Sequence, residues 1–159
     1  MRIVNTKELS EEKWVSPKGR FASAGIEVSE ALGRKPQSTD LNDRHPFDVE
    51  ICRIFAGKAA HPYHSHSAQW EFYHVISGRG VVRHEGAQTE IREGDAFLFK
   101  PGEAHQIIAD AETDLVLYVV ADNPIGECSY FPDSNKWLVR LPQRQVIRSE
   151  GLDYYEGEE

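Results

Sequence analysis

The stretch HPYHSHSAQWEFYHVISGRG, residues 61–80, places three histidines within its first six residues and a glutamate, Glu71, soon after them. Successive side chains of a β-strand point to opposite faces, so His64 and His66 are expected to project from one face. Glu71 is expected to share a face of its own strand with Tyr73 and other apolar side chains. A carboxylate buried without a partner is costly, whereas a coordinated divalent cation compensates its charge. The spacing therefore predicts a metal site.

A further histidine, His105, opens the predicted strand 105–109 directly after a Pro-Gly turn. Its partners in alternation, Ile107 and Ala109, are apolar, as an inward-facing strand requires. Three neutral imidazoles and one carboxylate suit Mn, Fe, Co, Ni or Zn and are too rich in nitrogen for Ca or Mg. We expect one divalent transition metal per chain, and an octahedral ion would keep two positions open.

An alternative explains the same residues without a metal. His64 and His66 would be loop histidines, and Glu71 would pair with Arg53 or Arg83. If either arginine pointed inward, it could instead clamp a carboxylate or phosphate of a ligand. For both arginines we favour an ion pair at a strand edge.

Tyr73 shares the predicted inward face with Glu71, so it is a candidate for a supporting contact beside the metal. An inward-facing aromatic side chain most often packs in the core, which is the alternative for this residue. His74, the next residue, points to the opposite face and is not expected to be a ligand. No catalytic acid or base can be assigned from the sequence.

The elements that must position these residues are short runs rich in Val, Ile, Phe and Tyr, separated by Gly or Pro. Such a pattern predicts an all-β fold, here with its strands connected as an antiparallel meander. Glycines 86, 94 and 102 stand in the turns, where a positive φ is expected. The predicted strands are 49–55, 70–77, 80–84, 89–92, 96–100, 105–109 and 115–121.

Three segments divide the chain. Residues 1–47 read as an irregular N-terminal arm, 48–121 as the β core, and 122–159 as a C-terminal extension that packs on the core and ends in an acidic tail. A length of 159 residues suits one domain with a real hydrophobic core.

Charge and hydropathy exclude several classes of protein. A net charge of −8 has the wrong sign for a nucleic-acid binder. No apolar run is long enough to cross a membrane, and the N-terminus lacks the features of a secretory signal, so we expect a cytoplasmic protein. Cys52 and Cys128 lack Cys-x-x-Cys spacing, which argues against a thiolate zinc site.

The same residues resemble the two motifs of the cupin superfamily. The first motif, G(X)5HXH(X)3-4E(X)6G, is matched with one extra residue after its first glycine by Gly57, His64, His66, Glu71 and Gly78. The second, G(X)5PXG(X)2H(X)3N, is matched by Gly94, Gly102 and His105. Lys100 replaces the motif's proline and Ala109 its asparagine, and neither departure affects a candidate ligand.

The resemblance implies a small, single-domain cupin with a jelly-roll β-barrel, in which His64, His66, Glu71 and His105 hold the metal. It also implies a homodimer, for which the arm 1–47 could be exchanged between copies. We expect a metal-dependent enzyme that acts on a small polar organic molecule, as a dioxygenase or as a sugar or sugar-phosphate isomerase. The isomerase requires a base that the sequence does not identify. The alternative is a non-catalytic module that binds a sugar or carboxylate beside a metal.

Overall fold

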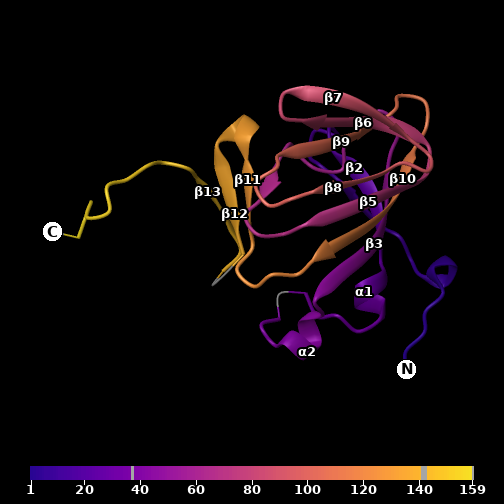
Figure 1. The fold of residues 1–159 in the computed structure, drawn as a ribbon, viewed down its shortest axis with the longest axis horizontal. Coiled ribbons are helices and arrows are strands. Elements are labelled where there is room, and N and C mark those ends of the chain that lie inside the picture. Colours follow the sequence, from indigo (N-terminus) through magenta and orange to yellow (C-terminus); the bar gives the residue numbers. More distant parts are fainter. Residues whose placement is uncertain (37, 141–142, 159) are drawn as a thin grey trace.

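The computed structural model describes residues 1–36, 38–140 and 143–158. Its strands form a six-stranded, a four-stranded and a three-stranded sheet, which enclose the interior of a jelly-roll barrel (Figure 1). The strands are β1 (Glu12–Val15), β2 (Ala22–Glu27), β3 (Phe47–Ile54), β4 (Ser65–His66), β5 (Glu71–Ser77), β6 (Arg79–His84), β7 (Ala87–Arg92), β8 (Ala96–Phe99), β9 (His105–Ala109), β10 (Leu115–Asp122), β11 (Cys128–Phe131), β12 (Lys136–Val139) and β13 (Gln145–Arg148). The helices are α1 (Val28–Ala31) and α2 (Leu41–Arg44), with short 3-10 helices at Thr6–Glu8 and Pro132–Ser134.

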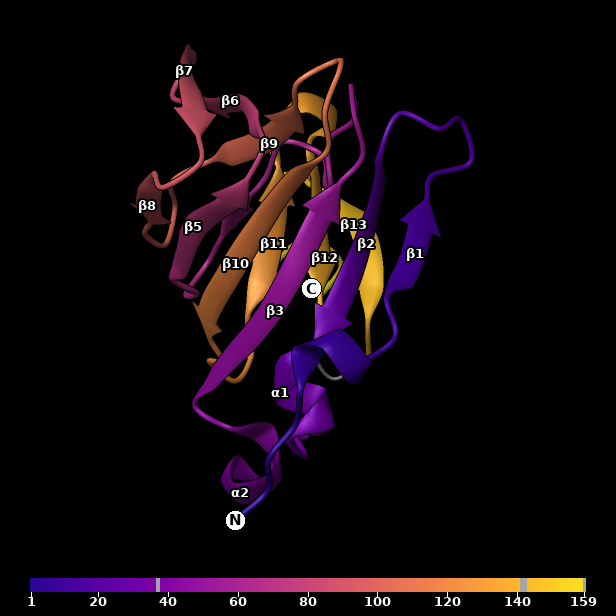
Figure 2. The same cartoon turned by 90° about the vertical axis from the view of Figure 1, so that its right-hand side faces the viewer.

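The largest sheet has the strand order β1-β2-β3-β10-β5-β8, which can be followed across Figure 2 from right to left. Strands β11, β12 and β13 lie behind it in that view and form the second sheet with β4. The third sheet has the order β7-β6-β9. The all-β jelly roll is confirmed, but the meander is wrong, because β10 lies between β3 and β5, and β8 pairs with β5 rather than with β7.

The strands predicted between residues 49 and 121 are present with shifts of one or two residues at their ends. The arm is more regular than expected, since β1 and β2 extend the large sheet by pairing with each other and with β3. Strand β2 consists mainly of Ala, Ser and Gly, residues with weak strand preference. It is a strand because its inner residues are covered, with Ala22 and Ala24 both buried.

The core lies between the sheets, on the inner faces of β3, β5 and β10. Its most deeply buried side chains are Ile54, Val75, Leu115 and Leu117. They come from three adjacent strands of the large sheet and alternate with outward-facing residues, as the strand period requires. This alternation also decides which polar residues of the same strands face inward.

Glycine is required where β5 gives way to β6. Gly78 has a φ of +85°, and a Cβ added there would lie 2.2 Å from the carbonyl oxygen of Asp114. The last glycine of the first motif therefore allows the chain to pass directly against the start of β10. The predicted turn glycines Gly86, Gly94 and Gly102 also have positive φ.

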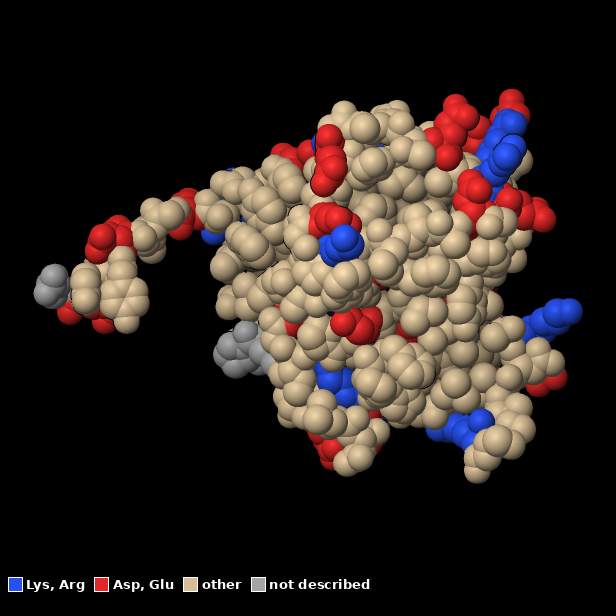
Figure 3. Space-filling model, in the orientation of Figure 1, with Lys and Arg blue, Asp and Glu red and all other residues tan. Residues whose placement is uncertain are grey.

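Charged side chains are distributed over the surface in small groups of both signs on the face shown in Figure 3. Acidic side chains follow the tail that extends from β13. Both α-helices are four residues long, and none of the helices in the described part of the chain has the length and apolar character needed to span a membrane.

Candidate metal centre

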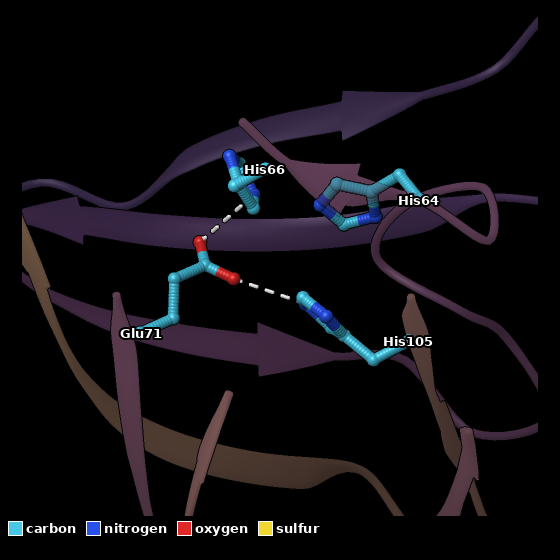
Figure 4. A group of neighbouring side chains, drawn as sticks. All are labelled: His64, His66, Glu71 and His105. Atoms are coloured by element: carbon cyan, nitrogen blue, oxygen red, sulfur yellow. Dashed lines mark ion pairs between the residues drawn. The ribbon is translucent and has the colours of Figure 1, made fainter. Parts of the chain in front are cut away.

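Four side chains from separate parts of the barrel wall converge at one point, as Figure 4 shows. His66 lies on β4, Glu71 opens β5, His105 opens β9, and His64 directly precedes β4. Each offers one nitrogen or oxygen atom, and these atoms all lie within 4.8 Å of one another. The four residues proposed from their spacing are therefore arranged like a metal site.

Hydrogen bonds on the ring side that faces away from the cluster fix the tautomers of His64 and His105. Nδ1 of His64 lies 2.8 Å from the carbonyl oxygen of Pro62, and Nδ1 of His105 lies 3.1 Å from that of Glu103. A carbonyl oxygen only accepts, so Nδ1 carries the proton in both rings, and Nε2 keeps its lone pair for the cluster. This is the arrangement in which a neutral imidazole binds a metal through Nε2.

The third imidazole is held by a carboxylate. Nδ1 of His66 donates to Oε1 of Glu127 over 3.0 Å, and Glu127 is 2% exposed. Oε1 also accepts from the backbone N–H of Ser67, while Oε2 accepts from the backbone N–H groups of Ala68 and Gln69. Glu127 thereby fixes both the ring of His66 and the loop that follows it.

Two buried ring nitrogens of the cluster have no hydrogen-bond partner among the described residues. Nε2 of His66 lies 3.4 Å and Nε2 of His105 lies 2.9 Å from the carboxylate oxygens of Glu71. Despite the short separation at His105, both Nε2 atoms are buried and lack a hydrogen bond of acceptable geometry to any described residue. Buried polar atoms are normally paired, so these two orphaned nitrogens fit a bound cation.

Electrostatics favour the protonation states that a metal needs at two of the donors, His64 and Glu71. Burial, together with the neighbouring histidines His105 and His66, lowers the pKa of His64 to about 3. Burial by itself would raise the pKa of Glu71, but His105 and His66 outweigh it and hold the pKa below its usual value. A neutral imidazole and an ionised carboxylate are both ready to coordinate.

Aromatic rings surround the cluster. The Tyr73 hydroxyl donates to Oε2 of Glu71 over 3.0 Å, so Tyr73 does contact a candidate ligand, as its strand face predicts. The Phe99 ring stacks on the His105 ring with centroids 3.9 Å apart and planes 2° apart. These contacts restrict the side chains of Glu71 and His105 to orientations that face the cluster.

Three residues that we did not expect to bind the metal are found outside the ligand cluster. His74 is exposed on the outer face of β5. Arg53 pairs with Glu11 and Asp114, and Arg83 pairs with Asp133. Neither arginine pairs with Glu71, and the ion pairs that we favoured for them are present.

The cluster opens into a cavity of about 600 Å³, a volume typical of small-molecule sites. Glu27 and Glu50 line this cavity and are direct partners across β2 and β3. Through Val119 of β10, Glu50 stands in the same row of the sheet as Tyr73. Burial and the nearby Glu27 raise the pKa of Glu50 to about 8.

Sequence analysis missed Glu127, Glu27 and Glu50. Glu127 lies in a turn-rich segment between β10 and β11, and its spacing from His66 in the chain has no regularity. Glu50 lies within a predicted strand, in alternation with Cys52, and this offered a signal that Glu50 faces inward. Its partner Glu27 lies in the arm, where no strand was predicted.

Known proteins resemble this chain in sequence and in fold. The sequence profile of the family described as "Cupin domain" matches residues 50–121. The oxalate-binding protein of Thermotoga maritima is 33% identical over 57 residues, which make up 36% of this chain and 47% of that protein. The match thus spans less than half the length of this curated relative.

Two solved structures share the fold over nearly the whole chain. One is a sugar phosphate isomerase of the cupin superfamily from Silicibacter pomeroyi, with a TM-score of 0.77, 20% identity, and coverage of 96% of this chain and 98% of that one. The other, from Acidithiobacillus ferrooxidans and described provisionally as a sugar phosphate isomerase, has a TM-score of 0.77 and 22% identity, with 92% of each chain covered. Residues 50–121 therefore match a cupin domain, and the chain shares the jelly-roll fold of these two structures.

Proposed function

We propose that His64, His66, Glu71 and His105 hold one divalent transition metal, and that the protein is a metal-dependent enzyme acting on a small polar organic molecule. The buried, orphaned Nε2 atoms of His66 and His105 support the metal. Three imidazoles and a carboxylate suit Fe, Mn, Ni, Co or Zn. When bound, such an ion would supply Lewis-acid polarisation of a substrate oxygen.

Among the reactions open to such a site, we favour an isomerisation of the sugar or sugar-phosphate type. In this reaction a base takes the proton from the hydroxyl-bearing carbon next to a carbonyl. The freed electron pair forms a carbon–carbon double bond while the π pair of the carbonyl moves onto its oxygen, which gives an enediolate. A proton then returns to the former carbonyl carbon, and the neighbouring hydroxyl loses its proton and becomes the new carbonyl. Substrate and product contain the same atoms, so no oxidant is consumed. The chain must therefore provide a group that accepts and returns a proton.

The observation that carries this choice is the pair Glu27 and Glu50 in the cavity that also holds the four candidate ligands. Two carboxyl groups that face each other share a proton readily, because repulsion disfavours ionisation of both. We assign the proton transfer to Glu50, which stands in the row of Tyr73 on the inner face of the sheet. A pKa near the working pH, as Glu50 has, suits a group that both accepts and donates.

The chain's other residues have supporting parts in this proposal. Tyr73 holds Glu71 in place through its hydroxyl group. The apolar side chains of Ile54, Leu117 and Val119 line the cavity and limit the access of water to the reacting carbon. The two structural neighbours named as sugar phosphate isomerases support the same reaction type.

The test is exchange of a carbon-bound hydrogen with solvent. Metal-loaded protein is incubated in D₂O with a panel of aldose and ketose phosphates, and deuterium incorporation next to the carbonyl is followed by NMR. The proposal expects incorporation by the parent protein and a loss of about 100-fold or more in Glu50→Gln, in line with the usual contribution of a general base. Glu90→Gln, an exposed glutamate on β7, is the matched control.

The competing proposal is a binding module without turnover, which the name of the Thermotoga maritima oxalate-binding relative supports. It expects tight binding of a sugar or carboxylate by the metal-loaded protein with no exchange in any substrate of the panel. Dioxygenase activity is the other reaction that the sequence left open. It expects iron as the native metal and consumption of oxygen, which an oxygen electrode would measure.

We also propose that the chain is a homodimer paired through β1. This strand is the edge of the six-stranded sheet, and Trp14 and Val15 on it are 48% and 59% exposed. Exposed edge strands invite pairing with a second copy. Light scattering after gel filtration should give twice the 18.0 kDa of one chain, and Val15→Lys should shift the mass towards one chain. A single-chain mass for the parent at high concentration contradicts the proposal.

A further inference from the structure

Arg140 follows β12 and lines the cavity that contains the four candidate metal ligands. Its Nε atom is buried and has no hydrogen-bond partner within residues 1–36, 38–140 and 143–158. The ion pairs formed by those residues do not include Arg140 either. A guanidinium group stays positively charged in proteins, so an anion that reaches Arg140 would form a favourable pair with it.

Two other arginines that line the cavity, Arg34 and Arg44, have partners within the protein, although the Nε atom of Arg34 is also buried without a hydrogen bond to a described residue. Arg34 lies 2.6 Å from Asp48 and 3.2 Å from Glu30. Arg44 donates to three backbone carbonyl oxygens. Arg140 differs from them because its side chain has no hydrogen bond or ion pair to a described residue, although it lines the cavity of the candidate metal centre.

Two carboxylates have charges that reach Arg140, namely Glu127 and Glu71. Glu127 is saturated, because its two oxygens already accept hydrogen bonds from His66, from the Ser67 hydroxyl and from three backbone N–H groups. Glu71 is engaged by Tyr73 and faces the histidines of the cluster. Both carboxylates are thus committed to building the metal centre, and neither is free to pair with the guanidinium.

We propose that Arg140 is the anion-binding residue of this cavity, and that the ligand of the metal centre carries a phosphate or carboxylate group that Arg140 binds. A guanidinium offers a planar, forked set of donors that matches either group with two parallel hydrogen bonds. Arg140 is half-buried, with its Nε atom withdrawn from water, and an incoming oxyanion offsets the cost of this partial loss of hydration. Burial lowers the pKa of Arg140, which reflects the same loss of hydration.

The cavity's charges orient such a ligand. Lys136 and the exposed Arg144 line the cavity together with Arg140, on the side formed by β12 and β13. Glu27 and Glu50 line it from β2 and β3. The oxyanion is attracted to the β12 side and repelled from the glutamate pair, so uncharged hydroxyl or carbonyl groups are left for the metal and for Glu50. The inference rests on the proposed function in placing the ligand at the metal centre, and it adds the chemical class of that ligand.

The experiment is calorimetric titration of metal-loaded protein with three small probes, namely glycerol, glycerol 3-phosphate and glycerate. They share a polyol skeleton and differ in the oxyanion. We expect the parent to bind at least one anionic probe about 10-fold or more tightly than glycerol, as a charge-assisted hydrogen bond provides. The preferred anionic probe tells phosphate from carboxylate. Because the readout is binding at equilibrium, it is independent of turnover and survives a failure of the isomerase proposal.

The variants assign the preference to Arg140. Arg140→Gln should lose the preference, and Arg140→Lys, which keeps the charge but not the fork, should retain part of it. The matched control is Arg83→Gln, because Arg83 pairs with Asp133 and does not line the cavity. Equal affinity of the parent for glycerol and both anions overturns the proposal, as does an Arg140→Gln variant that binds the anionic probe as tightly as the parent.

A stability measurement checks the folding of the variants and supplies a second test. Because Arg140→Gln removes a charge that the described residues leave unpaired, we expect its thermal midpoint without ligand to be no lower than that of the parent. A large drop would mean that the protein itself satisfies Arg140, and this too would overturn the proposal.

Discussion

Nδ1 of His66 donates to Oε1 of Glu127 over 3.0 Å, although 61 residues separate the two in the chain. The contact joins β4 to the residue before β11 and fixes the imidazole with Nε2 directed at the other candidate ligands. Burial opposes the charges on both sides of this contact, but the hydrogen bond outweighs it, so the pKa of His66 is raised and that of Glu127 is lowered. The metal centre thus depends on a carboxylate that does not itself belong to the ligand set.

Glu127→Gln should weaken metal binding by about 10-fold to 100-fold, the usual effect of removing a residue that orients a ligand. The amide keeps the size of the side chain but removes the charge that holds the His66 ring. The measurement is a competition titration with a chromophoric chelator.

The control for this variant is Glu103→Gln. Glu103 holds His105 through its backbone carbonyl, while its side chain accepts from the N–H of Lys100 in the turn. Substitution of the side chain should therefore leave metal affinity unchanged. Equal loss in both variants would show that the effect of Glu127 is general destabilisation rather than orientation of His66.

The ligand set predicts the metal content of four variants. His64→Ala, His105→Ala and Glu71→Ala should each retain much less than one equivalent of transition metal, because each removes a donor from the cluster. His74→Ala should retain the parent's content, since His74 lies on the outer face of β5. Elemental analysis of protein purified without chelator or histidine tag is the measurement. Metal loss in the His74 variant equal to that in the others would refute the assignment of strand faces.

The raised pKa of Glu50 leads us to expect that the stability of the protein depends on pH. Its pKa is about 8 in the folded protein, raised from an ordinary 4.5 by burial and then by Glu27 and Asp48. A raised pKa means that the contribution to stability is fully present below pH 4.5 and is lost as the pH rises through about 8. The free energy of unfolding of chelator-treated protein should therefore fall by a few kcal/mol as the pH rises from about 5 through about 8, and level off above that.

Glu50→Gln isolates this effect, because the amide cannot ionise. Denaturant titrations at several pH values should give a flatter profile than the parent's and a higher stability at pH 9. Glu90→Gln is again the matched control and should follow the parent. A Glu50→Gln profile parallel to that of the parent would exclude Glu50 as the titrating group.

Two glycines with nearly the same φ separate backbone strain from steric clash. Gly78 has a φ of +85° and its added Cβ meets the Asp114 carbonyl at 2.2 Å, whereas Gly94 has a φ of +89° with nothing within 4 Å. Gly94→Ala should cost about 1 kcal/mol for the positive φ alone. Gly78→Ala should cost at least about 2 kcal/mol more, because the backbone must move. Denaturant unfolding measures both, and equal losses would contradict the clash.

Residues on regularly alternating strands were predictable from the sequence. Glu71, Tyr73 and His74 were placed on their correct faces, because the strand period is strict and one face must be buried. Glu50 obeys the same rule within β3, but its importance emerges only when Glu27 is found opposite it. Glu27 lies in β2, where weak strand formers give no periodic signal.

The sequence by itself determined an all-β fold, a resemblance to cupins and the four candidate ligands, because motif spacing and strand alternation are local properties of the chain. Only the tertiary structure decided that Glu127 orients His66, that Glu27 faces Glu50, and that Arg140 enters the same cavity. These contacts join segments far apart in the chain, and their partners are selected by the order of strands in the sheets. That order is set by burial of the whole core, which no local pattern of residues encodes.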